Sequence, residues 1–156
     1  MNAGLLAHKL SLAVQYASNA KGLPTRAQFR RWVKAALQRD AYITLRIVDE
    51  AEGRELNSKY RGKNNATNVL TFTYGDAGQL SDDIVLCAPV VAQEAAAQHK
   101  NLLAHYAHLT IHATLHVQGY VHEAETDAVK METLESLLML KLHYADPYLP
   151  DPYLSG

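Results

Sequence analysis

The stretch LLAHYAHLTIHATLHVQG, residues 102–119, decides which kind of fold the chain adopts. It predicts a helix over 102–117 that ends at Gly119, because glycine is a natural helix stop. It belongs to the half of the chain after Pro89, where helical sequence predominates: an Ala- and Gln-rich helix over 89–99 comes before it. A third helix, capped by Thr126 or Asp127, follows, and its apolar side is expected to hold Leu134, Leu137, Leu138 and Leu142.

The first half of the chain reads differently. Alternating apolar residues predict strands over 10–16 and 42–48, and two further β-rich runs lie at 68–74 and 83–87. Helices are expected after Pro24 and Thr25 and over 50–60. Strands first and helices later predict an α+β fold, a small mixed β-sheet of about four strands packed with about five helices. Residues 1–145 are interpreted as one domain, and 146–156 as a Pro/Tyr-rich tail that is extended or disordered.

Composition narrows the class of protein. The chain has 156 residues, a net charge of −1 and one cysteine, Cys87. A nearly neutral protein needs a local basic patch to bind nucleic acid, and a single cysteine allows neither an internal disulfide nor a multi-thiolate zinc site. No run has the length of a signal peptide or a membrane span, so we expect a cytoplasmic protein with no membrane partner. Cys87 itself is expected to be buried and inert.

Three histidines around Gly119 form a candidate metal site on the helix and the turn after it. His112 and His116 are four residues apart, so both can bind one ion, and His122 can return to it after the glycine. Three imidazole ligands with water in a fourth position are typical of catalytic zinc. The spacing matches the metzincin proteases, but Ala113 stands where those enzymes carry their glutamate base. His105 and His108, earlier on the helix, are interpreted as supporting or packing residues.

Several motifs resemble the YbeY family of bacterial rRNA-maturation endoribonucleases. The segment HATLHVQGYVH, 112–122, is similar to its metal motif, and NSKYRGKNNATNVLTF, 57–72, to a second motif; DDIVLC, METLE and DPY also recur in order. Ala113, Val121, Asn68 and Asp82 depart from the family pattern. The resemblance implies one Zn²⁺ per chain and cleavage of single-stranded RNA. It also implies maturation of the 3′ end of small-subunit (16S) rRNA and late-stage 70S ribosome quality control, with rRNA, the ribosome and the small ribosomal subunit as partners and no DNA.

Arg61 is the candidate for phosphate binding, because a guanidinium grips phosphate oxygens through two hydrogen bonds. The arginine of the family motif falls on this residue. Lys59 and Lys63 flank it and form, with Arg61, a basic strip for RNA binding; we assign catalysis to Arg61 and His116. The structural alternative is that Arg61 anchors the following loop through a carboxylate partner.

The sequence admits more than one mechanism and more than one class of protein. The attacking group is either water activated by the metal or the RNA 2′-hydroxyl. The chain could instead be a non-catalytic, metal-stabilised ribosome-assembly factor, whereas Ala113 disfavours a metallopeptidase. Tyr60 could stack on bases, and Phe72 is expected in the core. A second basic set is either a solvated helix face or an extension of the RNA surface: Arg26, Arg30 and Lys34.

Overall fold

A computed structural model describes residues 8–74, 81–120 and 124–149. It contains four strands: β1 (Leu10–Ala17), β2 (Ala41–Val48), β3 (Val69–Phe72) and β4 (Asp82–Cys87). The helices are α1 (Arg26–Ala36), α2 (Glu50–Arg61), α3 (Ala88–Ala97), α4 (Leu102–Val117) and α5 (Glu125–Lys141). The predicted α+β fold with a small mixed sheet is confirmed. Within these ranges every helix is too short or too polar to traverse a lipid bilayer.

The four strands form one sheet in the order β1-β2-β4-β3. The first three of these neighbours run parallel, with α1 and α2 in the connections between them, whereas β3 is antiparallel to β4. Alternation along β2 sends Ile43, Leu45 and Ile47 to one face and Thr44 and Arg46 to the other. Because both faces are covered in part, each face of the sheet has its own apolar cluster.

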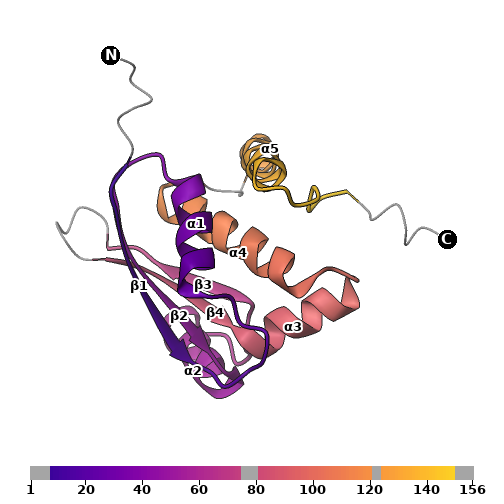
Figure 1. The fold of residues 1–156 in the computed structure, drawn as a ribbon. Helices are drawn as coiled ribbons and strands as arrows, with labels where there is room; N and C mark the ends of the chain where they lie inside the picture. Colours follow the sequence, from indigo (N-terminus) through magenta and orange to yellow (C-terminus); the bar gives the residue numbers. More distant parts are fainter. Residues whose placement is uncertain (1–7, 75–80, 121–123, 150–156) are drawn as a thin grey trace, which may run out of the picture.

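The larger cluster lies between the sheet, α1 and α4, which occupy the same side of the sheet in Figure 1. Ten of the 16 residues of α4 are buried, as expected of a helix that runs through the centre of a core. The largest fully buried side chains are Trp32, Tyr106, Phe29, Ile43, Leu45, Ile47, Ile84, Leu86, Ile111, Leu115, Met131 and Met139. The smaller cluster, on the α2 side, contains Val48, Leu70, Val85 and Cys87.

The last helix differs from its prediction. It begins at Glu125, and its N-cap residue Ala124 makes no side-chain cap hydrogen bond, so the cap predicted at Thr126 or Asp127 is wrong. The fully buried positions are Met131, Glu135 and Met139, whereas Leu137 is 59% exposed. Since Leu137 lies two residues from Glu135, it points roughly 200° away from the side of α5 that contacts α4. A buried carboxylate therefore occupies the side that was expected to be apolar.

The start of the C-terminal tail is packed on the body of the protein. The Ser136 hydroxyl donates to the Asp146 carboxylate at 2.8 Å, and the Lys100 ammonium donates to the Pro147 carbonyl at 3.2 Å. The backbone N–H of Tyr148 also donates to Asp146, at 3.0 Å. The prediction of an extended or disordered tail is therefore wrong for residues 146–149, which form a turn held by these bonds; residues 150–156 lie outside the described ranges.

Candidate active site

The C-terminal end of α4 is fastened to the end of α1. The Gln118 amide donates to the Ala36 carbonyl at 2.8 Å and accepts from the Gln38 backbone N–H at 2.7 Å. The Tyr120 hydroxyl donates to the Gln38 side chain at 2.9 Å. These bonds set the place where the chain leaves the helix.

Gly119 allows the chain to turn there. Its φ is +104°, in the region that favours glycine, and the Tyr120 N–H donates to the Leu115 carbonyl at 3.2 Å. The turn predicted at Gly119 is thus present. His122, the third predicted ligand, and its neighbour Val121 lie outside the described residues.

A buried carboxylate joins two histidines of α4. His108 Nε2 lies 2.6 Å from Glu135 Oε1, and His112 Nδ1 lies 3.1 Å from Glu135 Oε2. The Tyr148 hydroxyl donates to Oε1 at 2.7 Å. Glu135 is completely shielded from solvent, so these three donors replace the water that its burial removes.

The protonation states of this cluster follow from its geometry. Burial raises the pKa of Glu135, but the hydrogen bonds from the two histidines and the tyrosine outweigh it and hold the pKa at about 2. Burial and the hydrogen bond to Glu135 raise the pKa of Tyr148, which keeps its proton. Because an ionised carboxylate only accepts hydrogen bonds, His108 donates from Nε2 and His112 donates from Nδ1.

A second carboxylate–histidine pair lies about two turns before His112 on α4. His105, 4% exposed, places Nε2 at 3.0 Å from Glu94 Oε1 on α3. The Asn68 amide donates to both Glu94 oxygens, at 3.0 and 3.2 Å, and so ties β3 to this pair. His105 therefore packs α4 against α3 and β3, which agrees with its interpretation as a packing residue.

His112 and His116 suit a shared metal ion. A neutral His112 with its proton on Nδ1 carries its lone pair on Nε2, the nitrogen that would then be available to a metal ion. His116, half-buried, follows one turn later on the same side of α4. Within residues 8–74, 81–120 and 124–149, no group of three His, Cys, Asp or Glu side chains is arranged to hold a metal ion. The predicted third ligand, His122, lies outside these ranges.

The basic strip of Lys59, Arg61 and Lys63 lies exposed at the C-terminal end of α2 and just beyond it. Gly62, with φ of +68°, ends the helix between Arg61 and Lys63. No carboxylate of the described residues forms an ion pair with Arg61. The Asn57 amide instead donates to the Asn65 carbonyl at 2.7 Å and holds the loop. The described contacts do not join the basic strip to the histidines.

Beside the basic strip is a groove of about 730 Å³ on the face of the sheet that α2 covers in part. Tyr60, 57% exposed, lines it and packs edge-on against Phe72 with ring centres 5.0 Å apart. Phe72 in turn packs against the smaller apolar cluster, as predicted. Arg46, also in the groove, is held by Glu52 through hydrogen bonds of 2.6 and 2.9 Å.

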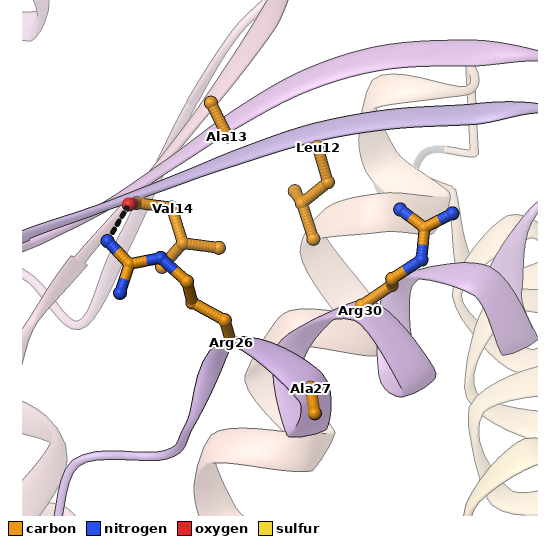
Figure 2. Close-up of a pocket in the computed structure, with 6 residues that line it drawn as sticks. All are labelled: Leu12, Ala13, Val14, Arg26, Ala27 and Arg30. Atoms are coloured by element: carbon orange, nitrogen blue, oxygen red, sulfur yellow. Dashed lines mark hydrogen bonds between the residues drawn. The ribbon is translucent and has the colours of Figure 1, made fainter.

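Arg26 and Arg30, two of the basic residues of α1, form hydrogen bonds to the edge strand of the sheet. Figure 2 shows Arg26 and Arg30 reaching from the helix toward β1 on either side of Leu12. Arg26 donates to the Val14 carbonyl at 3.1 Å, and Arg30 to the Leu10 carbonyl at 3.4 Å. They therefore satisfy carbonyls on an edge strand. From the sequence, these two residues were expected either on a solvated helix face or on an RNA-binding surface. Neither expectation included hydrogen bonds to the edge strand.

Comparison with known proteins identifies the family. The family model described as endoribonuclease YbeY matches residues 14–143. A curated relative from Methylobacillus flagellatus, named endoribonuclease YbeY, is 56% identical over 90% of this chain and 94% of the relative. A second relative of the same name, from Nitrosomonas europaea, is 55% identical over 90% of this chain and 86% of the relative. A solution structure of a Thermotoga maritima protein, 22% identical, has a similar fold, with a TM-score of 0.54 over 87% of this chain and 99% of that one.

The family match places the chain in the class of hydrolases that act on RNA. Within that class, the chain belongs to the YbeY family of endoribonucleases. The resemblance seen in the motifs is thus confirmed.

Sequence reasoning assigned no role to Glu135, Glu94 or Tyr148. Glu135 and Tyr148 do lie in the METLE and DPY motifs, so the motifs marked the positions. A glutamate on an amphipathic helix is ordinarily expected on the solvated side. The carboxylates that accept from His105, His108 and His112 could therefore be found only once α4, α3 and α5 were placed together.

Proposed function

We propose that this chain is a zinc-dependent endoribonuclease that cleaves single-stranded RNA. Its work is the maturation of the 3′ end of small-subunit (16S) rRNA and late-stage quality control of 70S ribosomes in the cytoplasm. Membership of the endoribonuclease YbeY family supports the RNA-cleaving activity. The observation that carries the zinc proposal is the hydrogen bond of His112 Nδ1 to buried Glu135, because ligand histidines commonly donate their other nitrogen to a carboxylate.

The residues divide the chemistry between them. His112, His116 and His122 hold one zinc ion, which when bound lowers the pKa of a water to about 7 and polarises a phosphate oxygen. Arg61 binds the scissile phosphate through two parallel hydrogen bonds and stabilises the charge that develops on it. Lys59 and Lys63 hold the neighbouring backbone of the strand.

Peptide hydrolysis is a poor alternative for this site. The position next to His112, which carries the base in metzincin proteases, is Ala113, and it is fully buried. Its side chain has no group that could take a proton. RNA offers an attacking group of its own, the 2′-hydroxyl, and the two candidates for the nucleophile can be told apart with a substrate that lacks it.

Metal analysis tests the zinc proposal. Protein purified without added metal is expected to bind one zinc per chain, and His112→Ala, His116→Ala and His122→Ala should each lose it. His99→Asn is a matched control, because His99 is exposed in the loop before α4 and asparagine tolerates its φ of 54°. Full zinc occupancy in His122→Ala would show that the third ligand is wrong.

RNA cleavage tests the catalytic proposal. Folded wild-type protein is expected to cleave a labelled single strand but not the same sequence in a duplex, and His116→Ala purified identically should not cleave it. Equal cleavage by the two proteins would point to a contaminating nuclease. Zinc binding without cleavage would favour the alternative of a metal-stabilised ribosome-assembly factor. A substrate with a single 2′-deoxy position then separates attack by water from attack by the 2′-hydroxyl.

A further inference from the structure

Glu135 connects the candidate metal ligand His112 to parts of the chain that no proposed function uses. Its two carboxylate oxygens have different partners. Oε2 accepts a hydrogen bond from His112, whereas Oε1 accepts hydrogen bonds from His108 and Tyr148. Rotation of the Glu135 carboxylate would therefore break its hydrogen bonds to α4 or to the turn that follows α5. The histidines come from α4 and the tyrosine from the turn 146–149 after α5.

The turn 146–149 is itself held in place from two sides. Asp146 accepts from Ser136 on α5 and from the Tyr148 backbone, and Lys100, just before α4, donates to Pro147. Tyr148 also packs edge-on against His108, with ring centres 5.2 Å apart. The C-terminal turn thus holds the Oε1 atom of the Glu135 carboxylate, whereas His112 is bonded to the Oε2 atom.

We propose that Glu135 is a positioning residue for the metal site and that the C-terminal turn, through Tyr148, clamps it. The proposal rests on the zinc site of the proposed function. Glu135 selects the His112 tautomer with its proton on Nδ1 and holds the ring so that Nε2 faces the ion. Tyr148 and His108 keep the carboxylate at the distance that this requires. Glu135 of the METLE motif and Tyr148 of the DPY motif thereby share one role, which is to position His112.

The pair of His105 and Glu94 provides a matched control within the same helix. It has the same chemistry, a histidine at 3.0 Å from a carboxylate, but it joins α4 to α3 about two turns before His112. Glu94→Gln therefore reproduces the loss of a carboxylate–histidine bond without touching His112. Glu132→Gln, at an exposed position one turn before Glu135 on α5, reproduces the change of charge.

Zinc affinity and histidine tautomers test the proposal. The metal-free proteins are titrated with zinc against a competing chelator, and the ring nitrogens of His112 are observed by NMR before zinc is added. Glu135→Gln is expected to weaken zinc binding about 10- to 100-fold, the usual effect of losing such a partner, and to mix the His112 tautomers. Tyr148→Phe, which removes one hydroxyl, should cause a smaller change in the same direction. Glu94→Gln and Glu132→Gln should leave both measurements unchanged.

The outcomes separate this proposal from the zinc site itself. If His112→Ala loses zinc but Glu135→Gln binds it as tightly as wild type, the positioning role is overturned and the zinc site stands. If His112→Ala keeps its zinc, both fail. A wild-type His112 with its proton on Nε2 also overturns the positioning role, whether or not Glu135→Gln folds. If Tyr148→Phe binds zinc as tightly as wild type and keeps the same His112 tautomer, the proposed clamping role of Tyr148 is overturned.

Discussion

Replacing Arg61 with alanine separates phosphate binding from a role in holding the fold together. Arg61 is exposed, and within the described parts of the chain it forms no ion pair. The stability that it contributes comes from its place in the last turn of α2, where a cation gains about 0.3–1 kcal/mol from the helix dipole. For a chain of this length, that corresponds to a decrease in Tm of roughly 1–4 °C.

The expected effect on cleavage is much larger. A charge-stabilising donor in an active site contributes about 2.7–4 kcal/mol to the transition state, or roughly 10²- to 10³-fold in kcat. Single-turnover cleavage of a labelled single strand should fall by that factor in Arg61→Ala, with zinc content unchanged. Arg61→Lys should recover little, because an ammonium keeps the charge but loses the paired hydrogen bonds.

Arg54→Ala is the matched control on the same helix. Arg54 is exposed and pairs with Glu50 at 2.7 Å, so its loss should change Tm about as little as the loss of Arg61 and leave cleavage intact. Lys59→Ala and Lys63→Ala should each weaken RNA binding and reduce the slope of log K against log salt by about 0.7. An Arg61→Ala protein that melts many degrees lower yet cleaves normally when folded would refute the reasoning and make Arg61 an anchor of the loop.

The free energy of unfolding should fall as the pH is lowered from 7 to 5, because burial holds the pKa of His105 below its ordinary 6.5 and the unfolded chain therefore binds the proton more readily. The unfolding free energy measured with urea should depend less steeply on pH in His105→Gln than in wild type. An unchanged slope would show that His105 is not the source of the pH dependence. Leu115→Ala, at a fully buried position, should cost about 2–5 kcal/mol, whereas Leu137→Ala, at an exposed one, should change stability by less than about 0.5 kcal/mol. Burial raises the pKa of the Cys87 thiol, so a thiol reagent should label native protein slowly and unfolded protein fast; rapid native labelling would show that the site opens readily.

Much of the fold could be predicted because its signals are local. The β1 and β2 strands alternate in hydrophobicity, and α4 was predicted with the bounds that it has, 102–117. The sequence fails where tertiary contacts override a local preference. Leu137 matches a helical apolar stripe but is exposed, because α5 turns Glu135 toward α4 instead. Likewise, the prolines of the tail indicate an extended chain, yet the contacts of Asp146 hold its first residues in a turn.

For the candidate site, the sequence by itself determined which residue types stand at metal-binding spacing and which family the motifs resemble. His112 and His116 share a side of α4 wherever that helix lies, since the spacing depends only on the helical repeat. Only the tertiary structure decided which partner each histidine meets. Glu94 is 11 residues from His105 and Glu135 is 23 residues from His112. Whether such distant groups come into hydrogen-bonding contact depends on how α3 and α5 pack against α4, and burial then makes each of those contacts obligatory.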